Sequence, residues 1–381
     1  MTPIEAAAFT IYEMVNMMMP VLYVLAFVFV LSLVVIVHEG GHFFAARLCG
    51  VAVTDYSLGF GKELWGRTDK KGTRWKICAL PLGGYVKMLG DEDAAGAKSS
   101  ADKVPENMRH LTFMAQKLWK RAVIIFSGPA MNYVFAVMML TGIMFFAGVG
   151  ELAPVIGTVM ENSAAEEAGV QAGDRVVSLN GNPVESYPDI QRIVRVTEFG
   201  KPLVMEIERS GETLTINVMP RQMEGYDIPL IGVKASEDAF TLRDDIGLGE
   251  AFITSVKQVY MMTADTLVYL GQVITNHRSP TEMRGPLGIA EASGDAARGG
   301  LLPLLVFIAN ISVAVGLMNL LPIPLLDGGH LAMYAVEAVR RKPMTEKAQS
   351  RLMWVGFSVL MGLVGYTFFL DIPRLVQRIF S

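Results

Sequence analysis

The chain has 381 residues, of which 52% are hydrophobic and only 18% are charged. About a quarter of the residues in a soluble globular protein are charged, so this composition favours a membrane protein. The formal net charge is −4, and we expect a lipid bilayer rather than a nucleic acid as the surrounding partner.

Four uncharged, apolar runs are long enough to cross a bilayer, which takes about 20 helical residues. The runs are Met14–Val37, Ala122–Gly150, Gly299–Leu326 and Leu352–Leu370. They predict a polytopic α-helical membrane protein with four transmembrane helices, in the segments 14–48, 122–150, 299–330 and 350–372.

Three ionisable residues, His38, Glu39 and His42, stand at the end of the first run, in "LVVIVHEGGHFF". On a helix the spacing i, i+4 puts both imidazoles on one face, as a zinc chelate requires, and Glu39 has the place of the general base in an H-E-x-x-H motif. Ionisable groups at membrane depth are costly and usually mark function. The alternative is two histidines bonded to carbonyl groups at a helix end, without a metal.

The segment 49–121 and its N-terminal flank are basic, because fourteen Lys and Arg residues lie between Arg47 and Arg121 inclusive. Basic loops stay in the cytoplasm, so we expect this segment inside and the N-terminus outside. Residues 51–90 alternate apolar and polar residues around glycine-rich turns, which predicts β-hairpin strands beside the membrane. Residues 91–108 are acidic and rich in Ala and Ser, and they predict a mobile loop.

The segment 151–223 has short β-type runs, and Asn180-Gly181 and Ser210-Gly211 are hairpin turn signals between them. Its stretch "EAGVQAGDRVVSLNG" resembles the core of a PDZ domain, which would lie outside the cytoplasm; an unrelated small sandwich is the alternative. A peptide could add as a strand at Val155, Ile156 and Gly157. The connecting segment 224–298 holds a helical pattern over 248–276, interrupted by charges, which predicts an amphipathic helix rather than a fifth span.

Two histidines leave a catalytic zinc one protein ligand short. The stretch "MNLLPIPLLDGGHL", residues 318–331, offers two candidates, Asp327 and His330. The first and third spans run in the same direction, so either candidate would lie toward the same membrane face as the histidine pair. The spacing alone leaves the choice open.

Five stretches together resemble the site-2 protease family of intramembrane zinc metalloproteases, in its bacterial RseP-like branch. They are His38-Glu39-Gly40-Gly41-His42, "SGPAMN" (127–132), the PDZ core, "GPLGIA" (285–290) and "NLLPIPLLDGGH" (319–330). The resemblance implies that His38, His42 and Asp327 bind Zn²⁺ and that Glu39 is the catalytic base. It also implies that Asn132 and Asn319 hold the unwound substrate or the site. The sequence departs from some close relatives in having one PDZ core rather than two.

The resemblance implies an intramembrane zinc metalloprotease that cuts the transmembrane segments of single-span proteins. Such substrates would already have been cut by a site-1 protease, and an anti-sigma factor or a signal peptide remnant would qualify. We expect a multi-pass protein of the bacterial inner membrane, with its active site near the cytoplasmic face and the PDZ domain periplasmic. The alternatives are a membrane scaffold with structural zinc and a metal transporter. The oligomeric state stays open.

Overall fold

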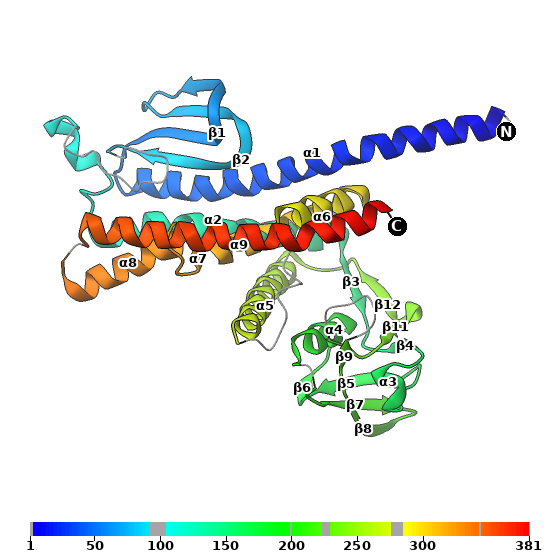
Figure 1. Cartoon of the computed structure of the whole chain (residues 1–381). Helices are drawn as coiled ribbons and strands as arrows, with labels where there is room; N and C mark the ends of the chain where they lie inside the picture. The colour runs from blue at the N-terminus through cyan, green and yellow to red at the C-terminus, as the bar shows by residue number, and fades with distance from the viewer. Residues whose placement is uncertain are drawn as a thin grey trace. The chain divides into compact units, whose positions relative to one another are not determined.

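The computed structural model describes residues 3–90, 104–198, 200–222, 229–275, 285–342 and 344–380. The chain forms two compact units, residues 1–140 with 284–381, and residues 141–283 (Figure 1). Most of the loop predicted to be mobile, at 91–108, lies outside the described residues.

Four of the described helices are long and apolar enough to cross a membrane, in agreement with the four apolar runs. Their candidate spans are Met19–Leu48, Leu118–Ala147, Leu301–Leu320 and Lys347–Pro373. These spans belong to α1 (Pro3–Leu48), α2 (Leu118–Ala147), α7 (Leu301–Leu320) and α9 (Glu346–Phe380). Helix α2 continues through Pro129, although proline removes a backbone donor.

The third predicted helix, at 299–330, is two helices in the structure. Helix α7 ends at Leu320, and α8 (Asp327–Arg340) begins at Asp327. Pro322 and Pro324 lie between them, and proline disfavours helical backbone in itself and in the residue before it. Leu325 has a φ of 86°, which a side chain of this kind rarely adopts. The break therefore places Asp327 in the first turn of a separate helix.

Strands β1 (Val53–Thr68) and β2 (Arg74–Met88) form an antiparallel sheet that packs against α1 (Figure 1). Residues 53–58 of β1 pair with both ends of β2, with 84–88 and with 74–77. Residues 84–88 pair with β1 alone among the described strands and so form an edge. The Tyr56 hydroxyl donates a hydrogen bond to the Ile36 carbonyl of α1, 2.7 Å away. This contact fixes the sheet against the helix that carries the histidines.

Two further helical segments complete this unit, a short 3₁₀ helix over Glu106–Leu111 and α6 (Pro286–Arg298). Asp371 of α9 accepts hydrogen bonds from the backbone N–H groups of Gly285 and Gly288 at the start of α6, at 3.2 and 3.0 Å. Tyr23 of α1 donates to Asp295 of α6, at 2.6 Å. Helix α6 is thus fastened to both α1 and α9.

The second unit is a β-rich module whose largest sheet has the strand order β6-β5-β7-β8. Smaller two-stranded pairs join β4 to β11, β3 to β12 and β9 to β10. The strands are β3 (Val149–Leu152), β4 (Ile156–Val159), β5 (Arg175–Leu179), β6 (Asn182–Pro183), β7 (Leu203–Arg209), β8 (Glu212–Val218), β9 (Arg221–Gln222), β10 (Pro229–Leu230), β11 (Val233–Ala235) and β12 (Phe240–Arg243).

Three α-helices belong to this module: α3 (Ala164–Glu167), α4 (Tyr187–Val196) and α5 (Leu248–Ile274). The two turn signals are confirmed, because all four residues of Asn180-Gly181 and Ser210-Gly211 have a positive φ, as type I′ hairpin turns require. In β7 every second side chain is buried, as expected of a strand with one face on the core. The helix predicted at 248–276 is α5, and it is not among the candidate spans of the described residues.

Candidate active site and metal centre

The two histidines of α1 face the same point from successive turns. His38 and His42 are 8% and 7% exposed, and their Nε2 atoms are 3.3 Å apart. The Nδ1 atom of His42 is 2.9 Å from the carbonyl oxygen of Ile124 in α2. A carbonyl only accepts, so Nδ1 of His42 carries a proton, and in the neutral ring Nε2 then keeps a lone pair.

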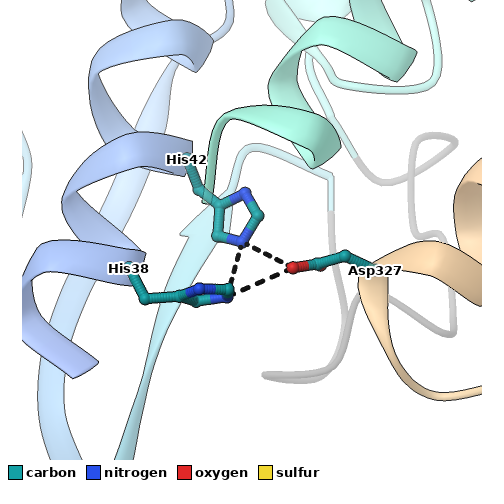
Figure 2. Close-up of side chains that lie close together, drawn as sticks. All are labelled: His38, His42 and Asp327. Carbon is teal, nitrogen blue, oxygen red and sulfur yellow. Dashed lines mark hydrogen bonds and ion pairs between the residues drawn. The ribbon is translucent and has the colours of Figure 1, made fainter. Parts of the chain in front are cut away.

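Asp327 completes a cluster of three possible metal ligands with these histidines (Figure 2). Its Oδ2 atom is 3.1 Å from Nε2 of His38 and 3.4 Å from Nε2 of His42. Tetrahedral zinc with bonds of about 2.0–2.1 Å holds its ligand atoms about 3.3–3.4 Å apart. The same Oδ2 atom is buried and accepts no hydrogen bond. Two imidazoles and a carboxylate at this spacing fit a catalytic zinc ion, which uses three protein ligands and leaves one position open.

Two glycines allow α1 and α2 to approach each other at the cluster. A Cβ atom on Gly41 would lie 2.2 Å from the carbonyl oxygen of Ser127, and one on Gly128 would lie 2.3 Å from Nε2 of His42. Neither position has room for a side chain. The two glycines in the H-E-x-x-H motif differ, because a Cβ atom on Gly40 would make only ordinary contact, 3.9 Å from the Tyr56 hydroxyl.

A cavity of about 300 Å³ lies beside the cluster. Its wall includes Glu39, Asn319 and His330, together with edge-strand residues such as Gly84 and Val86. The Glu39 carboxylate accepts a hydrogen bond from the backbone of Val86. The acidic group between the two histidines therefore faces the cavity and touches the sheet edge.

An ion pair forms part of the same wall. Arg121 of α2 donates to Glu337 of α8 over 2.8 Å, and both side chains are at least 85% buried. The Arg121 guanidinium also lies 5.1 Å from the centre of the Tyr334 ring. The pair joins α8, which carries Asp327, to α2, which contacts both histidines.

A second ion pair fastens the sheet to the end of α1. Arg47 donates to Asp69 over 2.7 Å. Burial alone would raise the pKa of the Asp69 carboxyl, but hydrogen bonds from Arg47, Thr73 and Trp75 outweigh burial and lower this pKa to about 2. Asp69 is consequently a carboxylate at neutral pH, and its bond to Arg47 joins the turn between β1 and β2 to the end of α1.

The remaining predicted residues lie in two different places, on the cavity wall and in the protein interior. Asn319 and His330 both line the cavity, but His330 is outside the cluster of possible metal ligands in the described chain. Asn132 is completely buried, is absent from the cavity wall, and contacts Nδ1 of His38 at 3.3 Å. The Ile124 carbonyl and the close approach at Gly128 were not predicted from the sequence. Ile124 and Gly128 are four residues apart and so share one face of a helix, which was the feature of the sequence that could have indicated them.

The backbone predicted as a peptide site, at Val155–Gly157, already has partners within the module. Ile156 is fully buried, and the backbone of residues 155 and 156 bonds to Ser236 on one side and to Gly173 and Asp174 on the other. No free strand edge therefore exists at Val155–Gly157. A cavity of about 90 Å³ lies instead between α4 and residues 229–233, where Ile190 and Val194 form part of the wall.

Comparison with known proteins agrees with this site. The profile of Peptidase family M50 matches residues 26–363. A protein of Agrobacterium fabrum that is named as a zinc metalloprotease is 37% identical over 93% of this chain and 96% of its own length. The Regulator of sigma-E protease RseP of Escherichia coli is 30% identical, over 92% of this chain and 98% of its own length. That alignment has 451 positions, more than this chain has residues, so RseP contains additional residues.

Solved structures of PDZ domains are among those similar to part of this chain. The PDZ domain of an SdrC-like protein from Listeria monocytogenes is 15% identical and covers 22% of this chain and 87% of that domain, with a TM-score of 0.21. This score is too low to support an argument about the fold.

The chain belongs to Peptidase family M50 and is a zinc metalloprotease. The predicted family, enzyme class and metal are thereby confirmed.

Proposed function

We propose that this protein hydrolyses peptide bonds inside the transmembrane segments of single-span membrane proteins. One observation carries the proposal. In the cluster of His38, His42 and Asp327, the two histidines lie in an apolar helix long enough to span a bilayer. The cluster borders a cavity of about 300 Å³. A hydrolytic site at membrane depth has lipid-embedded peptide as its natural substrate.

We assign the site residues as follows. His38, His42 and Asp327 hold the zinc ion, and Glu39 is the general base. Zinc supplies Lewis-acid polarisation of the scissile carbonyl and lowers the pKa of water. Glu39 takes the proton from the attacking water and returns it to the leaving amine. Its position beside His38 and on the cavity wall supports this role.

The substrate must lose its helical hydrogen bonds before water can reach a carbonyl group, because a helix in lipid bonds all of its backbone internally. The edge strand 84–88 borders the cavity and offers backbone groups to an extended peptide. Asn319 adds an amide that can bind the same peptide. Unwound substrate would thus add to the sheet next to Glu39.

The orientation and partners complete the proposal. The basic flank from Arg47 to Arg121 favours an active site near the cytoplasmic face of the bacterial inner membrane. The β-rich module would then lie in the periplasm, where it could exclude substrates with bulky outer domains. Substrates already trimmed by a site-1 protease, such as an anti-sigma factor or a signal peptide remnant, meet this requirement.

The test compares the wild-type chain with Glu39→Gln in detergent, using a single-span substrate without its outer domain. Zinc content is measured for both. The proposal expects equal zinc content and cleavage within the span by the wild type only. Equal cleavage by both proteins would remove Glu39 as the base. Zinc binding without cleavage by the wild type, even when several trimmed single-span substrates are offered, would contradict the proposed substrate class.

A further inference from the structure

Asn132 is too deeply buried to bind substrate directly. Its exposed fraction is 0%, and it is absent from the wall of the catalytic cavity, which does include Asn319. Its side-chain nitrogen Nδ2 is 3.3 Å from Nδ1 of His38, and its Oδ1 atom is buried without a donor. The Asn132 side chain therefore contacts His38 and does not line the cavity.

The ring of His38 can offer only one nitrogen to a metal. Its Nε2 atom faces Asp327 at 3.1 Å and His42 at 3.3 Å, so Nε2 is the metal-facing atom. A neutral imidazole carries its single proton on the other nitrogen when Nε2 donates a lone pair. With zinc bound, Nδ1 of His38 must then be a donor, and the group opposite it must accept.

The amide of Asn132 can meet this requirement by rotation. In the orientation described, Nδ2 faces Nδ1 of His38, so two donors would meet once Nδ1 carries the proton. Turning the amide by half a revolution exchanges its nitrogen and oxygen. Oδ1 then accepts the Nδ1–H bond of His38 and gains the partner that it otherwise lacks.

The partner of His42 follows the same pattern from the same helix. The Ile124 carbonyl accepts from Nδ1 of His42 at 2.9 Å. Ile124, Gly128 and Asn132 are spaced i, i+4 and i+8, so they share one face of α2 opposite the i, i+4 histidines of α1. This face of α2 thus offers one hydrogen-bond acceptor to each histidine ring. Gly128 lies between the two acceptors, and its lack of a side chain leaves room for both rings.

We propose that Asn132 is a positioning residue that selects the metal-binding tautomer of His38 by accepting its Nδ1–H bond through Oδ1. The inference rests on the proposed role of His38 as a zinc ligand. Outer partners of metal-bound histidines typically contribute about 10–100-fold to metal affinity. Asn132 thereby acts on the metal and on the orientation of the ring, without contacting substrate.

The experiment measures zinc retention of the full chain in detergent against a competing chelator. Asn132→Asp keeps the acceptor and removes the donor, whereas Asn132→Leu has a similar size and removes both. We expect Asn132→Asp to hold zinc at least as tightly as the wild type and Asn132→Leu to lose about 10–100-fold. Asn310→Leu is the control, since Asn310 of α7 also has a buried, unbonded Oδ1 and makes none of the described contacts with the histidines.

Two results would overturn the inference. Asn132→Asp could bind zinc as poorly as Asn132→Leu, which would make the donor the important atom, or Asn132→Leu could match the wild type. If a variant does not fold, the inference is tested by proton magnetic resonance of the ring N–H groups in the cobalt-loaded wild type. Two slowly exchanging ring N–H signals, one from each histidine ligand, support the inference, and a single signal contradicts it. A wild type that binds no zinc would overturn the proposed function as well.

Discussion

Replacing Gly128 with alanine should weaken the metal centre through a steric contact alone. The added Cβ atom would lie 2.3 Å from Nε2 of His42 and 3.0 Å from Cε1 of His38. Ordinary contact begins at about 3.4 Å, so one helix or the His42 ring must move by about 1 Å. The ring is held by Ile124 and the helices are held together at Gly41, so neither can move freely.

The size of the effect follows from two opposing contributions. Overpacking a well-packed interior costs about 1–3 kcal/mol. Alanine in place of glycine in a helix interior recovers about 0.5–1 kcal/mol. The clash falls on a metal-facing nitrogen, so we expect the net cost to appear as weaker zinc binding. At most about 2.5 kcal/mol remains, so Gly128→Ala should bind zinc up to about 70-fold less tightly. Activity should fall with it.

The assay is zinc retention against a chelator, together with thermal unfolding in detergent. Gly142→Ala is the matched control, because Gly142 lies in the same helix with no atom within 4 Å of its added Cβ. The control should keep its zinc and be as stable as the wild type or more so. If Gly128→Ala also keeps wild-type zinc affinity, the close packing of α2 on the histidines does not constrain the metal.

Two further predictions concern other parts of the chain. His330→Ala should retain zinc, measured by the same chelator competition, because we propose Asp327 as the third ligand and His330 lies outside the cluster; a loss of tenfold or more would make His330 the ligand instead. In the module, Asp174 accepts two hydrogen bonds from Arg209, at 2.6 and 2.7 Å. Burial raises the pKa of the Asp174 carboxyl, but these bonds outweigh it and hold this pKa below its ordinary value. The pair therefore stabilises the module above the unfolded pKa of about 3.9, and the stabilisation disappears as the pH falls through the folded pKa. Asp174→Asn should cost about 1–3 kcal/mol at neutral pH and progressively less in acid, by hydrogen exchange of β5 and β7 in the full chain; a cost that does not change with pH would contradict this account.

Features that depend on local spacing could be predicted from the order of the residues alone. Apolar runs of membrane length gave the four candidate spans, since the length of hydrocarbon to be crossed is fixed. The i, i+4 spacing of His38 and His42 required only a helix to bring their rings together. The turns at Asn180-Gly181 and Ser210-Gly211 were readable because few residue pairs adopt positive φ in succession.

Which distant residues meet the histidines depends on how the helices pack. Asp327 and His330 are three residues apart on one segment, and the break after α7 brings the first of them into the cluster. Asn132 was a substrate-binding candidate in the sequence, and packing against α1 buries it beside His38 instead. The strand edge predicted at 155–157 is already paired within the module. Each of these outcomes depends on contacts between segments far apart in the chain, and local periodicity carries no information about which partner a side chain or a backbone edge will find.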